Sequence, residues 1–249
     1  MTEVTRDYNL YTQKLSLLNG AQFQLEQTGQ TGNYPLYQVV IESAAATDWV
    51  LITAGVHGDE PAGPEAILHF LSRDNRALFQ RFNFFILPCI NPHGYERNTR
   101  ENSNGSDLNR SFEADIQAEV SFVKATLKDR RFCCTIDFHE DWEATGFYLY
   151  EARRNAPLMG KELLREVEKI GPIDTDTGGD EGDVALAPGH YPVALAWGTS
   201  GLVPYLYHFH TDHALNTETP TQWPLEQRVA AHLKLLDGVV ERHALTESA

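Results

Sequence analysis

The sequence has few cysteines, and the three that it has predict no covalent framework. Cys89, Cys133 and Cys134 lie in apolar runs, and no Cys-x-x-Cys pair occurs among the 249 residues. An odd number of thiols, two of them adjacent, argues against a disulfide scaffold and against a thiolate zinc site. Buried thiols of this kind are typical of proteins from a reducing compartment, so we expect a cytoplasmic location.

Long apolar runs and an excess of positive charge are also absent. The longest apolar stretch, residues 82–90, is interrupted by Asn83 and Pro88 and falls far short of the about 18 residues of a membrane-spanning helix. The first ten residues are largely polar and carry acids, so we expect no secretory signal. The chain holds 20 Lys and Arg against 35 Asp and Glu, a net charge of −15, which argues against nucleic acids and acidic lipids as partners.

Alternating strand-like and helix-like segments predict the fold class. No repeat, low-complexity tract or linker divides the chain, so we expect one domain over residues 1–249. Short, continuously apolar runs alternate with segments of helical spacing, which predicts an α/β fold with a mixed, mostly parallel central sheet flanked by helices. The expected helices are residues 7–18, 60–71, 113–127, 158–170 and 224–242; the expected strands are residues 22–27, 36–41, 50–54, 84–87, 132–138, 202–209 and 214–217; and long loops are expected over residues 91–110 and 171–200.

Two polar groups follow buried strands of the expected sheet. His57-Gly-Asp-Glu60 comes directly after the strand at residues 50–54, and His139 follows the strand at residues 132–138. The carboxyl ends of parallel strands lie at one edge of a sheet, so the fold can bring these three side chains together. Two histidines and one carboxylate with an open fourth position form the ligand set of catalytic zinc sites. Either group alone would more often have a structural or surface role.

A third polar segment, residues 91–110, places basic, amide and acidic side chains in one loop. Asn109 and Arg110 can hold a carboxylate through an amide donor and a guanidinium fork. Arg100 could face a developing oxyanion, and Asp107 could orient a metal-bound imidazole. On composition alone, a solvated loop of mixed charge is the simpler interpretation.

Together these motifs resemble the M14 family of zinc metallocarboxypeptidases, whose relatives include aspartoacylase and succinylglutamate desuccinylase. The matching elements occur in family order and span residues 50–220. They are Gly-Val-His57-Gly-Asp-Glu60, Asn91-Pro-x-Gly94, Arg100-x-Asn-x-x-Gly-x-Asp107-Leu-Asn109-Arg110, Asp137-x-His139 and Thr217-Glu218-Thr-Pro220.

The resemblance implies one zinc ion per chain and a role for each motif residue. The implied roles are zinc ligand for His57, Glu60 and His139, support of His57 for Asp107, binding of the substrate's terminal carboxylate for Asn109 and Arg110, stabilisation of the tetrahedral intermediate for Arg100, and general base for Glu218. A carboxylate within reach of a metal-activated water can take its proton and pass it to the leaving amine, which is the chemistry expected of Glu218.

One family feature has no clear counterpart in the sequence. The peptidase branch has a mobile tyrosine a short distance before the general base, and here that position falls near Trp197, with Tyr191 and Tyr205 on either side. The acidic segment at residues 180–183 and the acids that follow His139 favour basic substrate ends only weakly, because charge runs are usually solvated faces.

Three functions remain open from the sequence. The first is a zinc carboxypeptidase that removes C-terminal residues from peptides with a free carboxylate, and the long segment at residues 91–110 favours it. The second is a zinc amidohydrolase on the same scaffold, which would deacylate an N-acyl amino acid or trim cell-wall peptides. The third is a binding module that has lost turnover; its signature would be a missing ligand or base, and none is missing.

Overall fold

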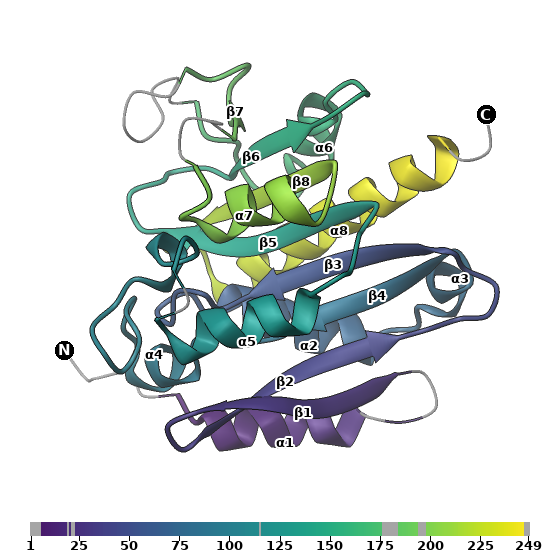
Figure 1. Ribbon diagram of the computed structural model, residues 1–249. Coiled ribbons are helices and arrows are strands. Elements are labelled where there is room, and N and C mark those ends of the chain that lie inside the picture. Colours follow the sequence, from purple (N-terminus) through teal and green to yellow (C-terminus); the bar gives the residue numbers. More distant parts are fainter. Residues whose placement is uncertain are drawn as a thin grey trace.

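One mixed β-sheet organises the molecule (Figure 1). The computed structural model describes residues 6–18, 20, 23–114, 116–175, 184–193 and 198–246. Within these residues the sheet has eight strands in the order β1-β2-β4-β3-β5-β8-β6-β7. The strands are β1 (Gln24–Thr31), β2 (Tyr34–Ile41), β3 (Asp48–Ala54), β4 (Phe82–Leu87), β5 (Cys134–Asp141), β6 (Tyr148–Arg153), β7 (His190–Pro192) and β8 (His213–Pro220). The central strands β4, β3, β5 and β8 run parallel, and antiparallel pairs join them to β2 on one side and to β6 on the other.

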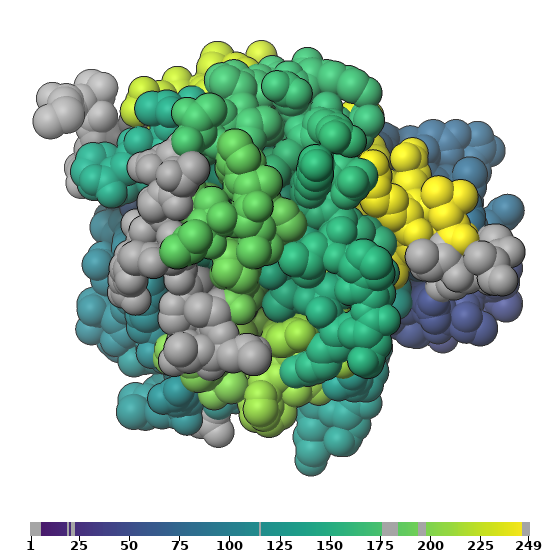
Figure 2. Space-filling model, turned by 90° about the horizontal axis from the view of Figure 1, so that it is seen from above, coloured from purple at the N-terminus to yellow at the C-terminus, as the bar shows by residue number. Residues whose placement is uncertain are grey.

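Helices cover both faces of this sheet. They are α1 (Tyr8–Leu18), α2 (Ala62–Ser72), α3 (Arg76–Phe79), α4 (Pro92–Arg97), the short 3₁₀ helix η1 (Leu108–Arg110), α5 (Ala118–Leu127), α6 (Gly160–Val167), α7 (Leu202–Phe209) and α8 (Leu225–Thr246). α1, α2, α6 and α8 share one core with the sheet, and α5 and α7 share another on the opposite face. In Figure 1, α5 and α7 stand in front of the sheet and α2 and α8 lie behind it. Figure 2 looks onto the β7 edge, where teal and green surface from β6 to α7 dominates.

The two-residue period of the strands decides which face each side chain joins. In β5, Ile136 belongs to the core shared with α2 and α8. Asp137 and His139 therefore point to the other face of the sheet or lie at its edge. β8 runs parallel to β5, and its register places Asn216 beside Asp137 and Glu218 beside His139. Four polar side chains from two strands therefore lie next to one another at the carboxyl end of the sheet.

The expected α/β class, with a mixed, mostly parallel sheet between helices, is confirmed. All five expected helices and six of the seven expected strands are present, with ends shifted by a few residues. Among the described residues, no helix combines the length and the apolar character that a membrane crossing requires. The three cysteines are free thiols, as expected.

The prediction of a strand over residues 202–209 was wrong, because this segment forms helix α7. Its dense apolar and aromatic side chains suggested a strand, yet Leu202 and Leu206 are one helical turn apart and both are fully buried. Pro204 stands in the first turn of the helix, where an N–H group would have no intrahelical partner.

Several shorter elements were also missed. β6 occupies residues to which no structure was assigned, and β7 lies inside the expected loop at residues 171–200. The loop expected over residues 91–110 contains α4 and η1. The side chain of Asn91 caps α4, because its Oδ1 accepts a hydrogen bond from the backbone N–H of Gly94 at 2.9 Å.

Candidate active site

The turn after β3 brings His57 and Glu60 to the carboxyl end of the sheet. β3 ends at Ala54, and Glu60 lies within the turn, just before α2 begins. This turn packs directly on α4. A Cβ atom at Gly58 would lie 1.9 Å from the carbonyl carbon of Gly94, so only glycine fits at this contact.

Glu60 lies between two histidines and contacts both. Its Oε1 is 2.6 Å from Nδ1 of His57, and its Oε2 is 2.9 Å from Nδ1 of His139. The backbone N–H of Glu140 also donates to Oε2, at 3.1 Å. One possible ligand atom from each of His57, Glu60 and His139 lies within 4.8 Å of the others, and all three residues are buried. We call these three residues the Glu60 cluster.

The other nitrogen of each histidine ring is held by a further carboxylate. Nε2 of His57 lies 3.3 Å from Oδ1 of Asp107, and Nε2 of His139 lies 2.8 Å from Oδ2 of Asp137. An ionised carboxylate only accepts, so Nε2 donates a hydrogen bond to Asp107 in one ring and to Asp137 in the other, and each Nδ1 faces Glu60. If a metal ion took the place of the protons between Nδ1 and Glu60, each Nδ1 would present its lone pair to that ion. Two lone pairs and a carboxylate that face one another are stabilised by a cation between them, and this donor set suits Zn²⁺.

The charges of the Glu60 cluster depend strongly on one another. Burial would raise the pKa of Glu60, but His57 and His139 outweigh it and hold this pKa well below its usual range. Burial would likewise lower the pKa of His139, yet Asp137 and Glu60 raise it well above its usual value. Positive charge is therefore favoured between the Glu60 carboxylate and the two histidine rings. A bound metal ion would take this position.

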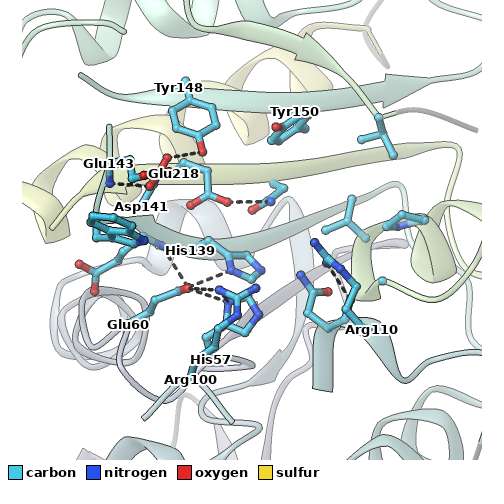
Figure 3. A pocket seen from close by; sticks show the side chains of 18 of the residues that line it. His57, Glu60, Arg100, Arg110, His139, Asp141, Glu143, Tyr148, Tyr150 and Glu218 are labelled. Carbon is cyan, nitrogen blue, oxygen red and sulfur yellow. Dashed lines mark hydrogen bonds and ion pairs between the residues drawn. The ribbon is translucent and has the colours of Figure 1, made fainter. Parts of the chain in front are cut away.

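A cavity of about 770 Å³ opens beside the Glu60 cluster (Figure 3). Arg110 lies on one side of the view and Asp141 and Glu143 on the other, with Glu218 and His139 between them. Its volume suits a small ligand or the end of a peptide. Seven of the eight site residues predicted from the sequence line this cavity; they are His57, Glu60, Arg100, Asn109, Arg110, His139 and Glu218. The eighth, Asp107, lies behind His57.

Asn109 and Arg110 belong to η1 and present amide and guanidinium donors to the cavity. Oδ1 of Asn109 accepts a hydrogen bond from the backbone N–H of Leu202 at 2.8 Å, which fixes the orientation of the amide group. Because the oxygen is engaged by α7, the amide N–H donors are left to face other partners. A guanidinium and an amide that lie next to one another form a suitable site for a carboxylate.

Arg100 lies against the Glu60 cluster and is held there by Asp107. Its Nε and Nη2 are 3.1 and 3.0 Å from Oδ2 of Asp107. Its Nη1 is 3.3 Å from Nδ1 of His57 and 3.8 Å from Oε1 of Glu60. Burial alone would lower the pKa of Arg100, but Asp107 and Glu60 raise it, so the side chain stays charged. A fixed cation in this position can stabilise negative charge that develops beside the cluster.

Glu218 stands next to His139 on the neighbouring strand and lines the cavity (Figure 3). Nδ2 of Asn216 donates a hydrogen bond to Oε1 of Glu218 at 3.1 Å. Burial raises the pKa of Glu218 to about 8, with Glu60 and Asp141 adding to the rise and His139 opposing it. A carboxylate with a pKa near neutrality can both accept and release a proton at physiological pH.

Two other acids of the cavity are engaged elsewhere. Glu140 accepts a hydrogen bond from the backbone N–H of Ala62 and pairs with Arg228. Asp141 accepts a hydrogen bond from the hydroxyl group of Tyr148 at 2.8 Å. These partners favour Glu218 over either acid as the proton acceptor of the site.

Several cavity residues were not found from the sequence. Tyr148 and Tyr150 line the cavity from β6, in register with Glu218 and Asn216 of β8. Because no strand was expected over β6, nothing pointed to these two tyrosines. Asp137 was part of a motif but was given no role; its place two residues before His139, on the same side of β5, was the available signal.

The other residues singled out in the sequence lie away from the cavity or outside the described residues. Tyr191 and Tyr205, the candidates for the mobile tyrosine, are buried; the ring of Tyr191 packs on Tyr150 and that of Tyr205 on Phe112. Trp197 and the acidic segment at residues 180–183 lie outside the described residues.

Sequence comparison identifies the family. Residues 46–172, just over half of the chain, match the catalytic domain of the succinylglutamate desuccinylase/aspartoacylase family. Carboxypeptidase SOL1 of Arabidopsis thaliana is 30% identical over 103 residues, and the match covers 34% of this chain. This match spans only 21% of the length of the Arabidopsis protein.

Solved structures share the whole fold. A protein of Shewanella amazonensis described as a metallopeptidase has a TM-score of 0.79 and 25% identity, covering 93% of this chain and 91% of that one. A metallo-carboxypeptidase of Pseudomonas aeruginosa, solved in complex with (2-guanidinoethylmercapto)succinic acid, has a TM-score of 0.71 and 15% identity, covering 95% of this chain and 68% of that one. The chain belongs to the succinylglutamate desuccinylase/aspartoacylase family of hydrolases and shares the fold of the M14-type metallo-carboxypeptidases.

Proposed function

We propose that the protein is a zinc-dependent carboxypeptidase that hydrolyses the C-terminal peptide bond of peptides. The observation that carries this proposal is that Asn109 and Arg110 line the same cavity as the Glu60 cluster. A terminal carboxylate bound by these donors would leave the adjacent amide bond beside the cluster. The Pseudomonas aeruginosa structure supports the proposal, because that protein shares the fold and was solved with a carboxylic acid.

The residues of the chain can serve each requirement of amide hydrolysis. Zinc bound by His57, Glu60 and His139 would supply Lewis acidity. Asn109 and Arg110 would bind and orient the carboxylate of the substrate, which fixes the position of the amide bond.

The charge and proton movements fall to two further residues. Arg100 would stabilise the negative charge that develops on the carbonyl oxygen, because its guanidinium is held beside the cluster by Asp107. Glu218 would take a proton from the attacking water and deliver it to the leaving amine. Asn216, which donates to Glu218, would hold its carboxylate in place.

A zinc amidohydrolase is the second candidate. The observation that favours it is the family match itself, since residues 46–172 match the catalytic domain of the succinylglutamate desuccinylase/aspartoacylase family. Such an enzyme would use the same residues to deacylate an N-acyl amino acid or to trim cell-wall peptides.

Product analysis separates the two candidates. Zinc-loaded protein is incubated with a peptide library, with the same peptides amidated at the C terminus, and with N-acyl amino acids, each with and without a chelator. Chelator-sensitive release of single C-terminal residues from the free acids supports the carboxypeptidase. Hydrolysis of N-acyl amino acids alone supports the amidohydrolase, and equal hydrolysis of free and amidated peptides contradicts the proposed use of Arg110.

Metal analysis tests the ligands separately from activity. We expect one zinc ion per chain in the purified protein and little in His139→Ala, because this substitution removes one of three ligands. Equal zinc content in both proteins would remove His139 from the ligand set.

A single domain and a cytoplasmic location are also part of the proposal. We propose one domain over residues 1–249 because all the strands that the structure describes join one sheet. The free thiols of Cys89, Cys133 and Cys134 support a reducing compartment.

A further inference from the structure

An arginine of the C-terminal helix reaches the residue that follows the proposed ligand His139. Arg228 lies in the first turn of α8, and its Nη1 pairs with Oε2 of Glu140. The side chain of Glu140 is fully buried, and that of Arg228 is only 14% exposed. A buried ion pair of this kind contributes much less to stability than its charges suggest. The informative property of this pair is its position, because Glu140 directly follows the proposed ligand His139.

Glu140 connects this arginine to Glu60 by two routes. Its Oε1 accepts a hydrogen bond from the backbone N–H of Ala62 at 2.5 Å, which fixes the start of α2 two residues after Glu60. Its own backbone N–H donates to Oε2 of Glu60 at 3.1 Å. Glu140 therefore holds Glu60 both through the chain that carries it and through a direct hydrogen bond.

Glu140 also lines the cavity, which gives its carboxylate an alternative position. Without Arg228, the buried carboxylate would lose its compensating charge, so it would either take up a proton or turn toward water. Either change alters the group that holds Glu60. The cavity, which Glu140 lines, is open to such water. If the side chain turned toward the cavity, the N–H of Ala62 would lose its acceptor and Glu60 would lose its support.

A second pair of an arginine and a carboxylate joins the end of α2 to α8 but lies away from the site. Arg73, just after α2, contacts Asp237 of α8, with 3.0 Å between Nη1 and Oδ2. These side chains are 31% and 36% exposed, and neither lines the cavity. Arg73 is therefore a matched control for the contact between helices α2 and α8.

We propose that Arg228 is a positioning residue of the metal site: by holding Glu140, it fixes Glu60 in the geometry in which it can bind a metal ion. This inference rests on the proposed role of Glu60 as a ligand. It predicts that a residue in the first turn of α8 sets the metal affinity of the Glu60 cluster, although no residue of that cluster belongs to α8. Arg228 itself contacts neither metal nor substrate in this account.

The test measures metal binding by the metal-free protein. Affinity for Zn²⁺ is measured by competition with a chromophoric chelator, and the absorption spectrum of bound Co²⁺ reports the geometry of the ligands. We expect Arg228→Met to bind Zn²⁺ about 10–100-fold more weakly and to shift the Co²⁺ spectrum, because loss of a supporting residue commonly has this effect on metal affinity. Arg228→Lys, which restores the charge without the guanidinium fork, should recover part of the affinity.

Arg73→Met separates this effect from a general loosening of the α2–α8 contact. It should lower the melting temperature while leaving the Zn²⁺ affinity and the Co²⁺ spectrum unchanged. If Arg228→Met does not fold, Arg228→Gln replaces it, because its neutral amide side chain also leaves Glu140 without a counter-charge. Wild-type Zn²⁺ affinity in the folded variant would overturn the inference alone, whereas absence of Zn²⁺ binding in the unmodified protein would overturn both the inference and the proposed metal site.

Discussion

Two groups of buried histidines and carboxylates among the described residues can be compared, and they differ in the atoms that surround the central carboxylate. One is the Glu60 cluster. The other, which we call the Glu151 cluster, consists of Glu151 of β6, His190 of β7, His213 of β8 and His243 of α8, all of them buried. Residue types and burial are nearly the same in the two clusters.

In the Glu151 cluster, fixed donors already occupy the carboxylate. The backbone N–H groups of Met159 and Gly160, at the start of α6, each donate to Glu151 at 2.8 Å. Nε2 of His213 lies 2.9 Å from Oε1, and Nε2 of His190 lies 3.0 Å from Oε2. This carboxylate therefore joins α6, β7 and β8 to the strand that carries it.

In the Glu60 cluster, each histidine pairs one ring nitrogen with a second carboxylate and turns the other nitrogen toward Glu60, where a metal ion could replace the proton, and a cavity gives access to this position. Among the described residues, the Glu60 cluster alone has three possible ligand atoms within 4.8 Å of one another. The pKa of Glu151 shows the contrast: burial would raise it, but the close contact with His190 and the hydrogen bonds of His213 and Met159 lower it to about 2. The direction of the ring nitrogens and access to a cavity, not residue type, distinguish a metal site from a structural contact. Changes at the cavity should therefore affect chemistry, and changes at Glu151 should affect stability.

Glu218→Gln should have the largest effect on the cavity side of this comparison. The amide keeps the shape of the side chain but cannot accept a proton, and loss of a general base typically lowers the rate by about 10²–10⁴-fold. Zinc content should be unchanged, and the melting temperature should not fall, because a buried carboxylate with a raised pKa is replaced by a neutral group. The rate is measured by residue release from a peptide, with Glu143→Gln as the control. A zinc-loaded Glu218→Gln protein of near-normal kcat would exclude Glu218 as the base.

Arg110→Ala should come next, with a loss of about 2–4 kcal/mol in kcat/KM for free peptides, because the substrate carboxylate loses its charged partner. The same substitution should cost little for C-terminally amidated peptides, which lack that carboxylate. Steady-state kinetics on both substrate series provide the measurement. Equal losses on the two series would show that Arg110 does not bind the terminal carboxylate.

Glu151→Ala tests the other side of the comparison. We expect it to lower the free energy of unfolding by about 3 kcal/mol, because several buried donors lose their acceptor at once. Zn²⁺ affinity should stay at the wild-type value, since the two clusters share no residue. Urea unfolding and chelator competition measure the two quantities. The control is Glu166→Ala on α6, which loses only contacts with Lys169 and Lys234 at the surface. A loss of Zn²⁺ affinity in Glu151→Ala would break the distinction between the clusters.

The two clusters also differ in how far the sequence could predict them. The residues of the Glu60 cluster occur in short motifs that directly follow apolar strands, so local spacing and the order of elements suggested a metal site, and the resemblance to the M14 family assigned its ligands. The Glu151 cluster has no motif, because its four residues come from four elements and meet only through strand pairing. β6, which carries Glu151, was not predicted at all.

The errors in the predicted fold have related physical causes. Residues 202–209 are apolar without a clear period, so burial on one face of α7 could not be distinguished from burial in a strand. Tyr148 and Tyr150 reach the cavity only because β6 pairs with β8, a long-range contact that no local pattern encodes. The pairing of Glu140 with Arg228, 88 residues apart, is of the same kind.

The pH dependence of stability should give the smallest effect, and it also belongs to the Glu151 cluster. Burial, together with His213, lowers the pKa of His243 to about 4, whereas a histidine of the unfolded chain has a pKa of about 6.5. Between these values the unfolded chain binds more protons, so stability falls as the pH drops from about 6.5 toward 4. The pKa of Glu151 is also lowered, so its contribution to stability is lost only when the pH falls below the ordinary pKa range of a carboxyl group. The contributions of His243 and Glu151 are therefore lost in different pH ranges.

His243→Gln should therefore make this dependence shallower, by on the order of 1 kcal/mol between pH 7 and pH 5. Glutamine can still donate a hydrogen bond to Nδ1 of His213 but does not titrate. Urea unfolding at pH 7, 6 and 5 measures the slope, and His69→Gln on the exposed side of α2 serves as the control. Because wild type and variant contain the same Glu60 cluster, its titration cancels in the difference between them. An unchanged slope in His243→Gln would exclude His243 as the source of the acid sensitivity. His213 of the same cluster and the buried His232, whose pKa values burial also lowers, would then be the groups to substitute.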